Sequence, residues 1–166
     1  MPISDVYTWR FTATVAATTA GTPLGSLISP ATKRAWIVGI RVKVLQTAAA
    51  AGFNSLIQLA RPNATNTATG LATVTAAHDF SAPASMSSVA TTWSTAPVLG
   101  TAVGAVLAEY NLPQTTGSMW EEWPPTGYEW QVPAIATGAA NSGVHVFITQ
   151  GVATSTPYAI DLIFSE

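Results

Sequence analysis

The sequence predicts an all-β fold, arranged as a sandwich or a barrel. Several short segments alternate apolar and polar residues with a period of two, which is the pattern of half-buried antiparallel strands. Gly, Pro, Asn and Ser separate these segments at short intervals, as expected for tight turns. No stretch is a convincing amphipathic helix of ordinary length. Many short strands joined by turns favour a sandwich or a barrel.

The first two predicted strands show the clearest alternation. In Tyr7–Ala17, aromatic and apolar residues alternate with Thr and Arg, and in Ala35–Gln46 one face carries Arg41 and Lys43. We expect these two cations to keep their face wet or available to an acidic partner. The residues expected on the opposite, buried face of the second strand are Trp36, Val38, Ile40, Val42 and Val44.

Four further strands are expected later in the chain. They cover Phe53–Ala60, Tyr128–Val132, Val144–Gln150 and Tyr158–Ser165. Val98–Tyr110 is the best helical candidate, but its Gly, Val and Thr content favours a strand. In the last strand, one face is expected to carry Tyr158, Ile160, Leu162 and Phe164, and the other Ala159, Asp161 and Ile163.

Turns and one long connection complete the predicted organisation. Turns are expected at Ala20–Pro23, Ser29–Pro30, Pro124–Gly127 and Asn141–Gly143. Residues 63–97 are rich in Ala, Ser and Thr and only weakly periodic, so we expect an ordered excursion with a short strand at Leu71–Ala76. Residues 1–166 are expected to form one domain, with residues 1–6 as an N-terminal arm that reaches a neighbour.

The composition excludes several functional classes. Only 8% of the residues are charged, against about a quarter in an average protein, and the formal net charge is −2. Six scattered Lys and Arg residues do not make a nucleic-acid-binding surface. Without Cys there is no disulfide and no thiolate metal site. The start of the chain lacks the features of a signal peptide, and the most apolar window is too short for a bilayer, so we expect a soluble protein made in a cytoplasm.

The ionisable residues give no positive indication of catalysis. Adjacent residues on an extended chain point to opposite faces, so His78 and Asp79 converge poorly and are interpreted as part of a surface loop. His145 lies on the more polar face of its predicted strand and is interpreted as a hydrogen-bonded surface residue. The sequon Asn63-Ala64-Thr65 is interpreted as a chance match. The acidic residues Glu109, Glu121, Glu122 and Glu129 lack the spacing of a calcium loop and are interpreted as solvated or interface acids. We therefore expect no enzyme activity, no cofactor and no metal.

Aromatic residues and prolines gather in the second half of the chain. This set has three interpretations: a plug of the sandwich core, an anchor for a protein interface, or a platform for stacking sugars. The candidate partner-interface residues are Trp93, Trp120, Trp123, Pro124, Pro125 and Tyr128.

The succession of short motifs along the chain resembles a known family. Thr32-Lys33-Arg34-Ala35-Trp36 precedes a strand, and the chain closes on Ile160–Glu166. The motifs between them are Leu59–Asn63, Thr92–Pro97, Asn111-Leu112-Pro113, Trp120, Pro125–Tyr128 and Val132-Pro133. In this order they are similar to small β-sandwich virion proteins of tailed bacteriophages, of the capsid decoration or cement type. The Gly-rich turn that follows Val-Pro in that family is represented here only by Ala134–Gly138.

The resemblance implies a fold, partners and a location. It implies a single antiparallel, jelly-roll-like β-sandwich that forms a homo-oligomer. A trimer is the preferred expectation, and a dimer is the second. This homo-oligomer would bind the phage major capsid protein on the outer surface of the head and stabilise the shell as part of the virion. The alternatives are a carbohydrate-binding or host-adhesion module, in which Trp120, Trp123 and Tyr128 form the platform, and a tail or head-fibre component.

Overall fold

All the regular structure that the computed structural model describes is β-sheet. The described residues are 5–16, 18–30, 32–45, 54–62, 66–75, 82–99, 105–132, 143–150 and 155–166. The strands are β1 (Val6–Val15), β2 (Thr18–Ile28), β3 (Ala35–Val44), β4 (Asn54–Ala60), β5 (Thr67–Thr69), β6 (Ala72–Thr73), β7 (Ser88–Ala90), β8 (Thr92–Thr95), β9 (Val106–Pro113), β10 (Met119–Glu122), β11 (Trp130–Val132), β12 (Val144–Gln150) and β13 (Thr156–Ser165). The predicted all-β class is confirmed.

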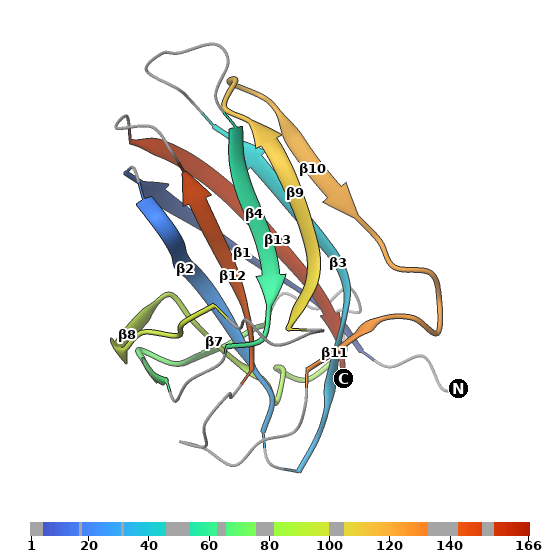
Figure 1. The fold of residues 1–166 in the computed structure, drawn as a ribbon. Coiled ribbons are helices and arrows are strands. Elements are labelled where there is room, and N and C mark those ends of the chain that lie inside the picture. Colours follow the sequence, from blue (N-terminus) through green and yellow to red (C-terminus); the bar gives the residue numbers. More distant parts are fainter. Residues whose placement is uncertain are drawn as a thin grey trace.

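Two antiparallel sheets pack face to face, as Figure 1 shows. Sheet A has the order β1-β13-β3-β10, and β11 continues along the edge of β3 beyond β10. Sheet B has the order β6-β7-β2-β12-β4-β9. Counting only the eight strands β1, β2, β3, β4, β9, β10, β12 and β13, the order is first-eighth-third-sixth in sheet A and second-seventh-fourth-fifth in sheet B. This is the arrangement of an eight-stranded jelly roll.

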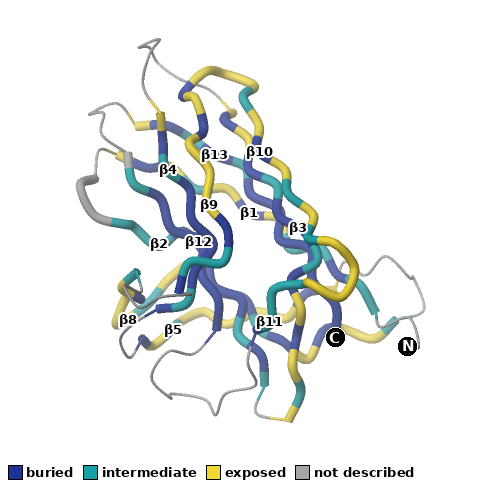
Figure 2. The backbone as a smooth tube through the Cα atoms, turned by 45° about the vertical axis from the view of Figure 1, so that its right-hand side comes forward, coloured by how far each residue is buried: buried dark blue, intermediate teal, exposed yellow. Residues whose placement is uncertain are grey.

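The core lies between the sheets and contains the side chains that alternation along the strands directs inward. The middle of β3 and of β12 is buried, as the dark segments of Figure 2 show. Two aromatic rings of sheet A, Tyr7 and Phe164, stack with 5.4 Å between their centroids. The inward residues of β13 are fully buried: Tyr158, Ile160, Leu162 and Phe164. This confirms the face of β13 that was predicted to be buried.

A β-bulge in β3 corrects one predicted face. The register of β3 against β13 shifts by one residue between Ile37 and Gly39, so Val38 is the extra residue of the bulge. A bulge reverses the alternation, because two residues then lie opposite one. The side chains from Ile40 onward point inward as predicted, but Trp36 is exposed on the outer face of sheet A. The prediction that Trp36 shares the buried face was wrong.

The predicted turn at Ala20–Pro23 was also wrong, because β2 runs through it. Pro23 lies opposite Phe147 of β12, beside a shift in register. On its other side β2 pairs with β7 only from Ser26 onward. Among the described strands, none is therefore hydrogen-bonded to Pro23 on the β7 side of β2. Proline has no backbone N–H to donate, so it is tolerated at a position where no neighbouring strand needs that donor.

The other predicted strands are found with small changes in their ends. β4, β11, β12 and β13 lie within or around the predicted segments, and β9 contains the C-terminal part of Val98–Tyr110. The turn at Pro124–Gly127 is confirmed by a hydrogen bond from the amide of Tyr128 to the carbonyl oxygen of Pro125 (2.9 Å). β10 was not predicted. Of the N-terminal arm, residues 1–4 lie outside the described residues, whereas Val6 pairs with Ser165 as the first residue of β1.

The excursion holds four short strands rather than one. The predicted strand at Leu71–Ala76 corresponds to β6, while β5, β7 and β8 were not predicted. β6 and β7 extend the edge of sheet B, and β5 pairs with β8 as a separate two-stranded sheet. Strands β6 and β7 of the excursion therefore extend sheet B, and hydrogen bonds with Tyr7 and Glu166 also connect residues 83–87 to the sheet A side.

Buried tyrosines predict alkaline sensitivity. Burial raises the pKa of Tyr158, whose hydroxyl lies 2.6 Å from Ser55 Oγ, and burial also raises the pKa of Tyr7. The folded protein thus favours the neutral phenol. The resulting stability is complete below the ordinary tyrosine pKa of about 10 and is lost as the pH rises through the higher folded pKa. We expect the urea midpoint of unfolding to decrease as the pH rises above about 10, and to decrease less steeply with pH in Tyr158→Phe. An equal slope in the two proteins would contradict this assignment.

Candidate functional site

A row of four alternating charges crosses the outer face of sheet A. Strand register places Arg10 opposite Asp161, Asp161 opposite Arg41, and Arg41 opposite Glu121. Arg10 donates two hydrogen bonds to Asp161 (2.6 and 2.8 Å), and Arg41 donates two to Glu121 (2.8 and 3.2 Å). Arg41 Nη1 also lies 3.8 Å from Asp161. The row is therefore a connected network in which the charges cancel.

The network fixes the ionisation of both its ends. Hydrogen bonds from Arg41, and then from Trp123, lower the pKa of Glu121 below its ordinary value. The hydrogen bond to Asp161 raises the pKa of Arg10. Glu121 is thus a carboxylate, and Arg10 and Arg41 are cations, over the whole neutral range. The outer face presents permanent hydrogen-bonding charges.

Trp123 lies on this face against the backbone of Gly39. A methyl group placed on Gly39 would lie 2.6 Å from Cε3 and 2.7 Å from Cζ3 of Trp123, so only glycine leaves room for the ring. The indole Nε1 donates a hydrogen bond to Glu121 Oε1 (2.6 Å), and half of the residue remains exposed. A glycine inside a strand often marks such a close approach. The ring is therefore held by packing on Gly39 and by the hydrogen bond that its nitrogen donates to Glu121.

Two other aromatic residues on this side of the molecule are exposed. Trp36 lies on the outer face of β3 because of the bulge, opposite Gln131 of β11. Tyr128 is 78% exposed and ends the turn after β10. Gly127 occupies the third position of that turn with φ +89°, which glycine adopts without strain. The turn is tightened by Glu129, whose carboxylate accepts a hydrogen bond from the Gly127 amide, and this bond lowers the pKa of Glu129.

The structure places the candidate interface residues in three different environments. Trp120 is buried in the core, and its ring stacks on Tyr110 across the open side of the sandwich between β9 and β10 (5.8 Å, 9°). Trp123 and Tyr128 are exposed beside sheet A, with Pro124 and Pro125 between them. Trp93 lies in β8, on the sheet B side. The three aromatic residues of the alternative sugar platform are therefore not on one surface, because Trp120 is inside.

Trp93 covers a buried Ser–His pair. Its indole nitrogen donates to Ser26 Oγ (3.0 Å), and Ser26 Oγ lies 2.6 Å from His145 Nδ1. His145 is fully buried, so the prediction of a surface histidine was wrong. It does lie on the outer face of β12, as predicted, but an element of the excursion packs over that face. With Ser26 equally buried, the pair joins the excursion to the sandwich and is closed to a substrate.

The excursion exposes a surface without charged side chains. Between Arg61 and Glu109 the sequence contains a single ionised residue, Asp79, which lies outside the described residues. We define the neutral patch as the exposed side chains of residues 66–75 and 82–99. Threonines dominate it, and three large apolar side chains project from it, each about half exposed: Leu71, Met86 and Val98. The strands β6 and β7 of this segment extend sheet B, whereas the Trp123 face belongs to sheet A. Residues 83–87 are also hydrogen-bonded to Tyr7 and Glu166 of the sheet A side.

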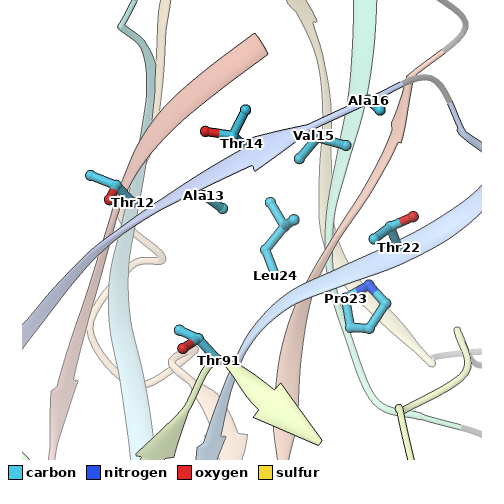
Figure 3. Close-up of a pocket in the computed structure, with 9 residues that line it drawn as sticks. All are labelled: Thr12, Ala13, Thr14, Val15, Ala16, Thr22, Pro23, Leu24 and Thr91. Carbon is cyan, nitrogen blue, oxygen red and sulfur yellow. The ribbon is translucent and has the colours of Figure 1, made fainter. Parts of the chain in front are cut away.

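A cleft lies on the open side of the sandwich between β1 and β2 (Figure 3). Its volume is about 570 Å³. The residues that line it are Thr12, Ala13, Thr14, Val15, Ala16, Thr22, Pro23, Leu24 and Thr91. None of these side chains ionises near neutral pH, so the cleft contains no general acid or base.

The acidic residues interpreted as solvated or interface acids lie on both sheets. Glu109 accepts a hydrogen bond from Gln58 on sheet B (3.1 Å), whereas Glu121 and Glu129 bind Arg41 and Gly127 on the other side. No group of three or more potential metal ligands occurs among the described residues. His78-Asp79 and the sequon at Asn63 lie outside the described residues.

No family model matches this sequence, and no curated protein is significantly similar to it. The described residues form no helix that is long and apolar enough to span a membrane.

Proposed function

We propose that this chain is a non-enzymatic structural protein of a tailed-bacteriophage virion. It binds the outer surface of the capsid as a small homo-oligomer and stabilises the head shell. The observation that carries the proposal is the neutral patch, which exposes Leu71, Met86 and Val98 on a surface without ionised side chains among its described residues. Such a surface is buried against a protein at low desolvation cost, because no charge has to leave water.

The fold supports the same function by analogy. Jelly rolls with two packed sheets form viral capsid proteins and lectins, among other proteins. A fold alone does not define a function, so the jelly roll is compatible with the proposed function but does not establish it. The physical requirement of a shell-stabilising protein is many identical weak contacts, which become strong together because neighbouring sites raise the effective concentration. A β-sandwich that exposes a neutral surface meets this requirement.

We expect charged substitutions in the patch to disrupt assembly without unfolding the protein. The neutral patch carries no charge, so its contacts with other proteins bury none. Leu71→Lys and Met86→Lys each place a cation there that would have to be desolvated, so each should shift the oligomer toward monomer and reduce binding to particles. Both side chains are already half exposed, so the fold should tolerate lysine. Light scattering after gel filtration gives the solution mass, and co-sedimentation with empty phage heads gives the binding.

Leu45→Lys is the matched control. Leu45 is 41% exposed, it follows β3 rather than lying in the excursion, and the substitution changes the net charge equally. It should leave mass and co-sedimentation unchanged. A monomer at all concentrations that binds no particle and is absent from virions would contradict the proposal. Labelled protein seen on tails instead of heads would support a tail or fibre component.

A further inference from the structure

The exposed indole of Trp123 has the properties of a preorganised stacking surface. Gly39 supports the ring, and the hydrogen bond to Glu121 holds its nitrogen (2.6 Å). Glu121 is held in turn by two hydrogen bonds from Arg41. Because the ring is already fixed, a ligand that stacks on it pays little entropy for ordering the protein. Half of the residue remains accessible for such a ligand.

Hydrogen-bonding groups border the ring. Each oxygen of Glu121 accepts from Arg41, and Oε1 also accepts from Trp123, but a carboxylate offers about four acceptor positions. Arg41 has five N–H groups and uses two of them for Glu121. The border can therefore both accept from and donate to additional hydroxyl groups while its own network stays intact.

An aromatic face with such a border matches a pyranose sugar. A pyranose ring has a face of C–H groups, which stacks on an indole, and a rim of hydroxyl groups, which both donate and accept. A partner that covered Arg41 and Glu121 with apolar surface would pay the cost of desolvating them. The four charges of the row cancel, so the row itself does not select an acidic sugar. Lys43, two residues along β3 on the same face, adds one cation. These properties distinguish this face from the neutral patch.

Trp36 extends the same face along β3. It lies three residues before Gly39 on the outer side of the strand, which corresponds to about 10 Å at the usual rise per residue. Its neighbour across the ladder is Gln131, which bears an amide that donates and accepts. A second stacking position in line with the first suits a linear oligosaccharide rather than a single sugar.

We propose that the outer face of sheet A binds a neutral linear oligosaccharide, with one pyranose ring stacked on Trp123, its hydroxyl groups bound to Arg41 and Glu121, and a further ring near Trp36. This inference is independent of the proposed capsid function, since none of the residues it uses belongs to the neutral patch. On a virion, it would give the protein a glycan-binding face separate from the neutral patch.

The test uses cellohexaose, chitohexaose and maltohexaose as probes, with polygalacturonate as the anionic comparison. Each is titrated at up to millimolar concentration into the full-length protein, while the indole N–H resonances are followed by NMR. We expect at least one neutral hexasaccharide to shift the Trp123 resonance, with an affinity that falls roughly tenfold or more in Trp123→Ala. Trp36→Ala should weaken binding by a smaller factor, and Trp123→Phe should retain part of it.

Controls separate binding from folding and from the capsid function. Tyr128→Ala removes the most exposed aromatic residue of the described part of the chain and should leave the affinity unchanged. The urea midpoint of each variant reports its fold. The proposal is rejected if no neutral hexasaccharide shifts the Trp123 resonance, or if Trp123→Ala binds as well as the parent. If Trp123→Ala instead loses particle binding while no sugar binds, the face docks a protein. Met86→Lys should keep sugar binding even where it abolishes assembly.

Discussion

Replacing Phe164 by alanine should lower the free energy of unfolding by about 3–5 kcal/mol, the usual cost of removing a buried phenylalanine. Phe164 is fully buried in β13, the strand that pairs with both β1 and β3. Its ring stacks on Tyr7 and lies next to the β3 bulge, opposite Ile37. Three strands meet at this position, so the surrounding side chains have little freedom to fill the cavity. Urea unfolding followed by tryptophan fluorescence measures the change.

Two companion variants give the scale. Phe164→Leu keeps most of the apolar volume and should lose less than half as much, because the cavity that remains is smaller. Tyr128→Ala removes an aromatic residue of similar size that is 78% exposed, and it should change stability by less than about 0.5 kcal/mol. A loss below about 1 kcal/mol for Phe164→Ala would mean that the sheets repack around the gap.

Strands with regular alternation could be predicted from the sequence. In β1, β12 and β13 each residue's own neighbours determine the pattern, because the side-chain period of an extended chain is two. The buried face of β13, from Tyr158 to Phe164, is the one that alternation indicated. β12 and β13 lie inside their sheets and β1 lies at the edge of sheet A, and one face of each strand meets the apolar core.

The errors occur where a distant segment decides the structure. Trp36 points outward because of a bulge whose position depends on pairing with β13, far along the chain. Pro23 lies inside a strand because β7 stops short of it. His145 is buried because Trp93, from the excursion, covers it. None of these partners is visible within a local window of sequence.

The candidate site shows the same division. Had β10 been recognised as a strand, alternation would have placed Glu121 and Trp123 on the face opposite to Trp120, as the structure does. Gly39, within a run of branched residues, was a signal that another group approaches the strand. That this group is Trp123 follows only from the pairing of β10 with β3.

Glu166→Ala is expected to destabilise the protein and to release the excursion from the sandwich. The Glu166 side chain is almost fully buried, and its carboxylate accepts hydrogen bonds from the amides of Met86 (2.8 Å) and Ser87 (2.6 Å). Lys33 Nζ lies 4.0 Å away. Alanine leaves two amides without their acceptor, and at the usual cost of such groups the free energy of unfolding should fall by about 2–4 kcal/mol.

The same substitution connects stability with the proposed function, because Met86 belongs to the neutral patch. Hydrogen exchange should accelerate first at the amides of Met86 and Ser87 in Glu166→Ala, and the oligomer should weaken even under conditions where the sandwich remains folded. Glu166→Gln should be intermediate, since its amide oxygen can replace only part of the carboxylate. Lys33→Ala removes only a distant, half-exposed cation and should have little effect. If exchange at the two amides stays slow in Glu166→Ala, the carboxylate does not hold the excursion, and the patch is ordered by its own strands, β5 to β8.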